Sequence, residues 1–240
     1  MMLPVMTLAA VAAGVIQSVT GFGSAILLML AAPFFFDMVS AAAVSSSISM
    51  GLGISLALRF RRHIQWELCA LPALVYALCS VTAIRMVRGI DLDALTLAFG
   101  GFLMALSVYF FLFAPHISFP PNRKSGCLCA AVSGLTSGLF GIGGPLMAVY
   151  FVSASRDKES YIANIQCLFA LTNIVSFVTR VTSGIYTPRL IPVTLLGLAG
   201  ILLGQRLGLR ILARMELKGM KQVVYAFVGL SGLLTILQQI

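Results

Sequence analysis

The stretch Phe140-Gly141-Ile142-Gly143-Gly144-Pro145 interrupts an apolar segment that runs from residue 126 to residue 153. Glycine offers no side chain to pack and proline has no N–H to donate, so one helix must end here and another must begin. The stretch Thr20-Gly21-Phe22-Gly23 breaks the segment 3–36 in the same way. Each segment is too long for one membrane span of about 20 residues and too short for two. The sequence therefore predicts two glycine-broken helical hairpins, at 3–36 and 126–153.

The amino-acid composition indicates that these hairpins lie in a membrane. Of the 240 residues, 60% are hydrophobic and 10% are charged, against roughly 25% charged residues in an average soluble domain. So few charges cannot form the polar shell of a soluble protein. This excludes a soluble globular protein, a disordered chain and a nucleic-acid-binding domain, despite the net charge of +9. The five cysteines lie in or beside apolar runs and are interpreted as small apolar residues, so no metal and no cofactor is predicted.

Six further apolar runs are long enough to cross a bilayer, and charged loops separate them. They are the ranges 39–58, 68–87, 92–113, 160–178, 190–207 and 217–237. The predicted fold class is an all-α membrane protein with one integral-membrane domain.

The chain is interpreted as two copies of one unit, 1–120 and 121–240. A shift of 120 residues superimposes glycine, aspartate and proline without a gap for about 65 residues. The coinciding pairs include Gly21 with Gly141, Gly23 with Gly143, Asp37 with Asp157, and Pro72 with Pro192. Each unit would consist of one hairpin followed by three spans.

The basic residues predict how the hairpins are oriented, because cytoplasmic loops hold an excess of Lys and Arg. If each hairpin crosses the membrane, the sixteen basic residues divide seven to nine between the two sides. If each hairpin returns to its own side, they divide twelve to four. The second division favours re-entrant hairpins and places both termini outside. Limbs of 14 and 13 residues in the first hairpin would each reach about 20 Å into a core of roughly 30 Å. Two short full spans would give the same division and remain an alternative.

Three full crossings per unit would insert the second unit upside down. Such inverted-topology repeats are known from secondary transporters, where broken helices bind the substrate near the midplane. The new helices that begin at Ser24 and at Gly144 would present unpaired N–H groups and a partial positive charge, which suit an anion. No charged residue is expected well inside a span, since Arg180 is assigned to a span end. A cationic substrate is therefore not expected.

The candidate substrate-binding residues lie at the two glycine-rich tips and on the helix that follows the second one. They are Gln17, Thr20, Gly21, Gly23, Ser24, Ser137, Gly141, Gly143, Gly144, Pro145, Gln166 and Asn173. Gln166 and Asn173 are seven residues apart and share one helix face. The alternative for these amides is hydrogen bonding between helices, and for Ser46 and Ser49 it is small-residue packing.

These residues resemble the TauE/SafE sulfite exporter family. The resemblance is carried by Gly21-Phe22-Gly23-Ser24 and by the second-copy motif that ends in Gly143-Gly144-Pro145, and it covers nearly the whole chain. It implies a multi-pass protein of a bacterial or archaeal inner membrane that moves sulfite, organosulfonates or related sulfur oxyanions outward. The first copy departs from the motif, with Ser24-Ala25 where the second has Gly144-Pro145.

The leading interpretation is thus a secondary transporter of a small anion. An anion channel or an accessory subunit of a membrane complex is the alternative, whereas an enzyme is not expected because both histidines lie in loops and no catalytic arrangement is present. The expected partners are the anion and the lipid bilayer, with a homo-oligomer allowed and nucleic acid excluded. The sequence leaves open the specific anion, the coupling ion and the direction of transport.

Overall fold

The computed structural model describes residues 2–91, 93–95, 97–98, 101, 122–216 and 219. Over these residues the secondary structure is helical, without strands. In this part of the chain five helices are long and apolar enough to cross a membrane. They are α1 (Met2–Thr20), α3 (Met38–Arg59), α4 (Trp66–Met86), α8 (Lys158–Thr182) and α9 (Ile191–Ala213), the last preceded by the short helix η4 (Pro188–Leu190).

Four of these helices coincide with the expected spans 39–58, 68–87, 160–178 and 190–207. The expected span 217–237 and nearly all of 92–113 lie outside the described residues. The starts of α3 and α8 follow from their sequences, because the carboxylates of Asp37 and Asp157 accept hydrogen bonds from backbone N–H groups of the first turn. These two aspartates are one of the pairs related by the 120-residue shift.

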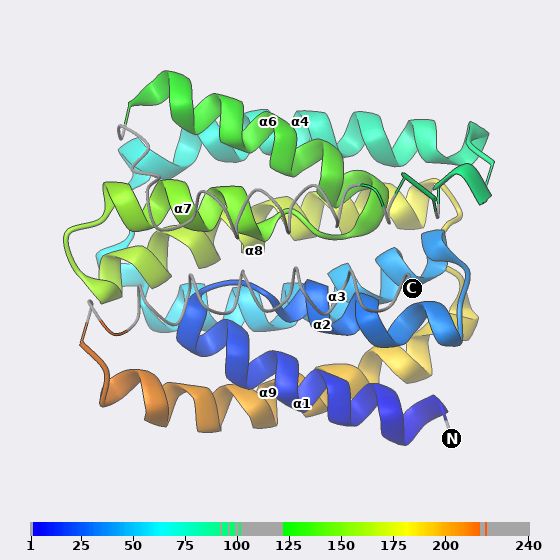
Figure 1. Ribbon diagram of the computed structural model, residues 1–240, viewed down its shortest axis with the longest axis horizontal. Coiled ribbons are helices and arrows are strands. Elements are labelled where there is room, and N and C mark those ends of the chain that lie inside the picture. Colours follow the sequence, from blue (N-terminus) through cyan, green and yellow to red (C-terminus); the bar gives the residue numbers. More distant parts are fainter. Residues whose placement is uncertain are drawn as a thin grey trace.

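Helix α1 is followed by α2 (Ser24–Ala31) and the short helix η1 (Ala32–Phe34), and α6 (Arg123–Phe140) is followed by α7 (Gly144–Ala154). In Figure 1, α2 turns back toward the end of the bundle where α1 begins, and α7 turns back toward the opposite end, where α6 begins. The first limb is longer than expected from the sequence. Its 19 residues extend about 28 Å, nearly a bilayer core, because the helix continues through Gly14 and ends only where Gly21 takes a positive φ.

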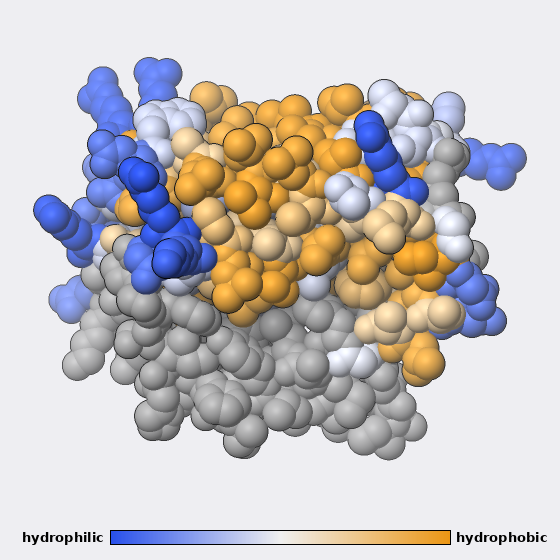
Figure 2. Space-filling view, turned by 90° about the horizontal axis from the view of Figure 1, so that it is seen from above, coloured by the Kyte–Doolittle hydropathy of each residue, from blue (hydrophilic) through white to orange (hydrophobic). Residues whose placement is uncertain are grey.

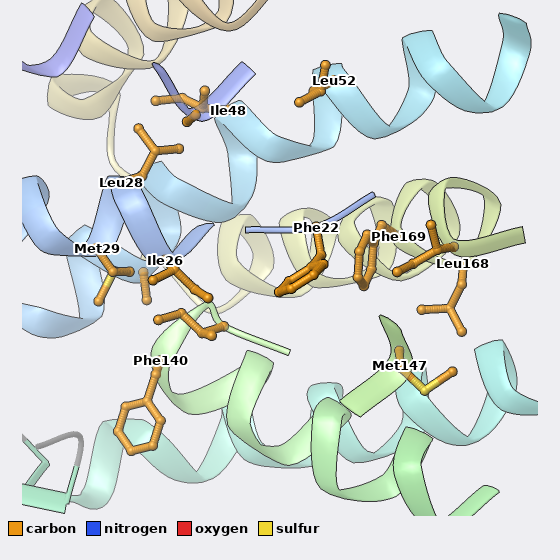
Figure 3. Close-up of a cluster of buried hydrophobic side chains, with 14 of the residues drawn as sticks. Phe22, Ile26, Leu28, Met29, Ile48, Leu52, Phe140, Met147, Leu168 and Phe169 are labelled. Atoms are coloured by element: carbon orange, nitrogen blue, oxygen red, sulfur yellow. The ribbon is translucent and has the colours of Figure 1, made fainter. Parts of the chain in front are cut away.

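The core forms where long helices pack in pairs. α1 lies along α9, α4 lies along α6, and α3 packs against α8 (Figure 1). The buried face of α3 consists largely of alanine and serine, which lets neighbouring backbones approach closely. Figure 3 shows Phe22 from the first break lying beside Phe169 of α8, so the tip of the first hairpin is packed against the second half of the chain.

The exterior of the bundle is apolar along its length. Figure 2 shows a hydrophobic band on one face, with hydrophilic residues gathered at its two ends. Side chains on this exterior include Leu74, Leu78 and Leu195, each more than half exposed. A surface of this kind would aggregate in water but is what a lipid environment requires.

The described basic residues lie toward the two ends of the bundle. The end where α3, α7 and α9 finish carries Arg59, Arg61, Arg62, Arg123, Lys124, Arg156, Lys158, Arg206, Arg210 and Arg214, and the opposite end carries Arg85, Arg180 and Arg189. At the first of these ends the Lys158 ammonium donates to the carbonyl oxygens of Leu212 (3.2 Å) and Met215 (2.6 Å). This contact satisfies carbonyls at the C-terminus of α9 and fixes it beside the start of α8.

Candidate functional site

Both hairpin breaks depend on glycine. The backbone of Gly21 has φ +84° and that of Gly23 has φ +101°, while Gly141 at the end of α6 has φ +72°. This left-handed region is costly for residues that carry a Cβ. The Gly21 N–H donates to Gln17 O (2.8 Å) and the Gly141 N–H donates to Ser137 O (2.9 Å), so each glycine closes its preceding helix.

The two new helices begin without a side-chain cap. Gly23 precedes α2 and Gly143 precedes α7, and neither helix start receives a hydrogen bond from a capping side chain of a described residue. Their first N–H groups therefore remain available, and each helix start carries a partial positive charge.

Both helix starts open into one small cavity. Its volume is about 30 Å³. On the same scale one water molecule needs roughly 10–15 Å³, so the cavity suits a few water molecules or a small oxyanion. The structure brings nine of the twelve candidate residues to its wall: Gln17, Gly23, Ser24, Ser137, Gly141, Gly143, Gly144, Pro145 and Asn173. The other three, Thr20, Gly21 and Gln166, lie behind the wall.

Those three residues hold the first tip in place. The Gln166 amide donates to Gly21 O (2.7 Å), and the Tyr161 hydroxyl donates to Thr20 O (2.6 Å), which attaches the tip to α8. The Gln17 amide donates to Gln166 Oε1 (3.0 Å), so a polar chain runs from the cavity wall to the second half of the protein. The amides of Gln17 and Gln166, which donate these hydrogen bonds, belong to buried residues. The geometry of the first tip therefore depends on α8.

The polar residues that the structure describes on the cavity wall are neutral. The Ser24 hydroxyl donates to Gln17 Oε1 and lies 2.7 Å from the Ser49 hydroxyl. Ser46 lies on the wall as well, but its hydroxyl donates to Ala42 O (2.8 Å) of its own helix. Asn173 lines the cavity too, and its amide makes no hydrogen bond to a described residue.

Besides Ser46 and Ser49, five wall residues are not among the candidates from the sequence: the aliphatic Ala25, Ile26 and Ile142, and the aromatic Tyr76 of α4 and Phe169 of α8. Phe169 could have been found, because it lies between Gln166 and Asn173 on the same helix face. Tyr76 follows the buried stripe of α4 and looks like any core tyrosine in the sequence. Only the packing of α4 along α6 brings it to the second tip.

The sequence places no charged residue well inside a span, and that expectation concerns position along the helix and not the direction of a side chain. Arg180 stands near the end of α8, as expected, but its side chain is fully buried. Its guanidinium Nη2 donates to the carbonyl oxygens of Gly138 (2.9 Å) and Ser137 (3.3 Å) in the last turn of α6. A long side chain can reach from a helix end back into the bundle, which sequence position alone does not reveal.

Comparison with known proteins yields two matches. The family described as Sulfite exporter TauE/SafE matches residues 6–235. A protein of Methanocaldococcus jannaschii (strain ATCC 43067 / DSM 2661 / JAL-1 / JCM 10045 / NBRC 100440), named as a probable membrane transporter protein, is 24% identical over 99% of this chain and 96% of its own length. No solved structure matches the chain.

Proposed function

The chain belongs to the TauE/SafE sulfite exporter family and is a multi-pass membrane transport protein, and from this premise we propose that its cargo is a small sulfur oxyanion. Sulfite or an organosulfonate would bind in the cavity between the two glycine-rich tips. Export through the inner membrane of a bacterium or archaeon is part of the same proposal.

The observation that carries this proposal is the meeting of two uncapped helix starts at one cavity. Backbone N–H groups and two aligned helix dipoles attract an anion without binding it as tightly as a full charge at the wall would. Glycine at both tips allows an oxyanion to approach the backbone closely. Such intermediate affinity suits a carrier, which must also release its cargo.

The same proposal includes two inverted repeats with re-entrant hairpins. In support, α1 packs along α9 as α4 packs along α6, and a two-fold exchange of the halves would turn one pair into the other. The hairpins also open toward opposite ends of the bundle in Figure 1. Repeats of this kind would let one half rock against the other around the cavity, which gives alternating access.

Asn173 provides the test of the proposed site. Purified protein is expected to gain thermal stability from at least one of sulfite, sulfate, thiosulfate and methanesulfonate, because a ligand that binds only the folded state stabilises it by mass action. Replacing Asn173 with alanine should weaken binding by about 1–3 kcal/mol, the cost of leaving a buried polar group of the ligand unpaired, and Asn173→Asp should weaken it further through like charge.

Leu171→Ala is the control for these variants, since Leu171 is exposed on the outer face of the same helix. The measurement is the shift of the unfolding temperature against anion concentration, with acetate as a carboxylate comparison. A wild-type protein that responds to no sulfur oxyanion would contradict the proposed function. Equal affinity of the Asn173→Asp variant and the wild type would remove Asn173 from the site.

The charge distribution predicts the orientation. The basic end of the bundle is proposed to face the cytoplasm, with both termini outside. Single cysteines placed in the Arg61–His63 turn should react with a membrane-impermeant reagent only after the cells are opened, and a cysteine at Thr187 should react in intact cells. A reporter fused to the C-terminus that is active in the cytoplasm would contradict this orientation and the inverted repeats together.

A further inference from the structure

Arg180 is among the largest fully buried side chains of the described residues. Its Nη2 caps carbonyl oxygens in the last turn of α6. A guanidinium has five N–H donors, and those on Nε and Nη1 find no hydrogen-bond partner among the described residues. Three of the five N–H donors of this buried cation are therefore without an acceptor in the part of the chain that the structure describes.

The charge of Arg180 also lacks a counter-ion among the described residues. All seven aspartates and glutamates of the chain belong to the described residues, and none of them accepts a hydrogen bond from the guanidinium. A buried charge without an opposite partner is strongly destabilising, and the partial charge of a helix C-terminus compensates it only in part. Capping the carbonyl groups at the end of α6 therefore does not require an arginine, because a neutral donor could form the same hydrogen bonds.

Arg180 lies directly behind the wall of the anion cavity. Its acceptor Ser137 lines that cavity, and Ser137 and Tyr76 both lie beside Gly143 at the start of α7. The described residues of the wall itself are all neutral. In the first half of the chain the position 120 residues earlier is Phe60, so the repeat does not place an arginine at the equivalent position.

We propose that Arg180 is a specificity-determining residue whose full charge, held one residue behind the cavity, makes the site prefer divalent over monovalent anions. This inference rests on the proposed function and adds the substrate's charge to it. A fixed cation acts through space, so its contribution to the binding free energy doubles when the charge of the anion doubles. In a medium of effective dielectric constant about 20, a cation roughly 10 Å away changes the affinity for a monovalent anion on the order of tenfold.

The test compares two anions of similar shape, divalent sulfate and monovalent methanesulfonate. The Arg180→Gln variant should lose on the order of tenfold in affinity for methanesulfonate and, as the square of that factor, about a hundredfold for sulfate. Arg180→Lys keeps the charge and should retain the preference for sulfate. Arg189→Gln is the matched control, because Arg189 is exposed at the same end of the bundle and should change neither affinity.

The unfolding temperature of the ligand-free protein separates this role from a structural one. Removing a buried charge that has no counter-ion should leave this unfolding temperature unchanged or raise it. Equal losses for the two anions, a lower unfolding temperature, or failure of Arg180→Gln to fold would assign Arg180 to helix capping and overturn the inference. Unchanged affinities would overturn it as well. A wild type that binds neither anion is a distinct result, which contradicts the proposed function and removes the inference with it.

Discussion

Replacing Gly143 with leucine is expected to reduce transport to less than about one hundredth of the wild-type rate, because the side chain has no room at the second tip. A Cβ at this position would lie 2.2 Å from the Tyr76 hydroxyl and 2.4 Å from the backbone oxygen of Ser133. Alanine already creates these contacts, so Gly143→Ala should lose most of the activity too. Leucine would in addition fill the space proposed for the anion. The measurement is uptake of the anion into vesicles that contain equal amounts of inserted protein.

Gly89→Ala is the control for this experiment. A Cβ at Gly89 would have no atom within 4 Å, so transport should remain at the wild-type level. Gly23→Leu should behave like Gly143→Leu, because its backbone has φ +101° and opens the start of α2. Normal transport by both leucine variants would show that the tips are not the site and that these glycines serve packing alone.

The second large effect is expected at the contact between α1 and α9. A Cβ on Gly204 would lie 2.0 Å from the backbone oxygen of Val11 and 3.0 Å from the backbone nitrogen of Val15. A backbone cannot turn aside as a side chain can, so the two helices would have to separate. The cost should reach or exceed about 3 kcal/mol, the upper end of ordinary overpacking.

Gly204→Ala should therefore lower the unfolding temperature markedly and reduce the yield of monodisperse protein in detergent. Gly51→Ala is a matched comparison, because its Cβ would lie equally close, at 2.0 Å, but to the flexible end of the Leu198 side chain. That side chain can choose another rotamer, so Gly51→Ala should cost much less. If both variants unfold at the same temperature, the close backbone contact of α1 and α9 does not determine stability.

The positions of the helix breaks follow from local chemistry and could be predicted. Glycine with positive φ closes α1 and α6 at the tips named from the sequence, and aspartate begins α3 and α8 at equivalent positions. These features need only neighbouring residues along the chain. The expected first limb, with 14 residues, is shorter than α1, which has 19. A helix that glycine breaks ends at the last residue that can still complete a helical turn, and the sequence does not mark that residue.

The composition and spacing of the sequence by themselves determined the membrane character, four of the described spans, both glycine tips and nine residues of the cavity wall. Each is a property of residues close together in the chain. The tertiary structure alone decided that Gln166 supports the first tip, that Tyr76 reaches the second, and that the Arg180 side chain points into the interior. Helix packing brings together residues separated by more than forty positions, and a side chain as long as arginine can end far from the place of its Cα. No local pattern records either fact, so the charge behind the cavity became visible only in the folded protein.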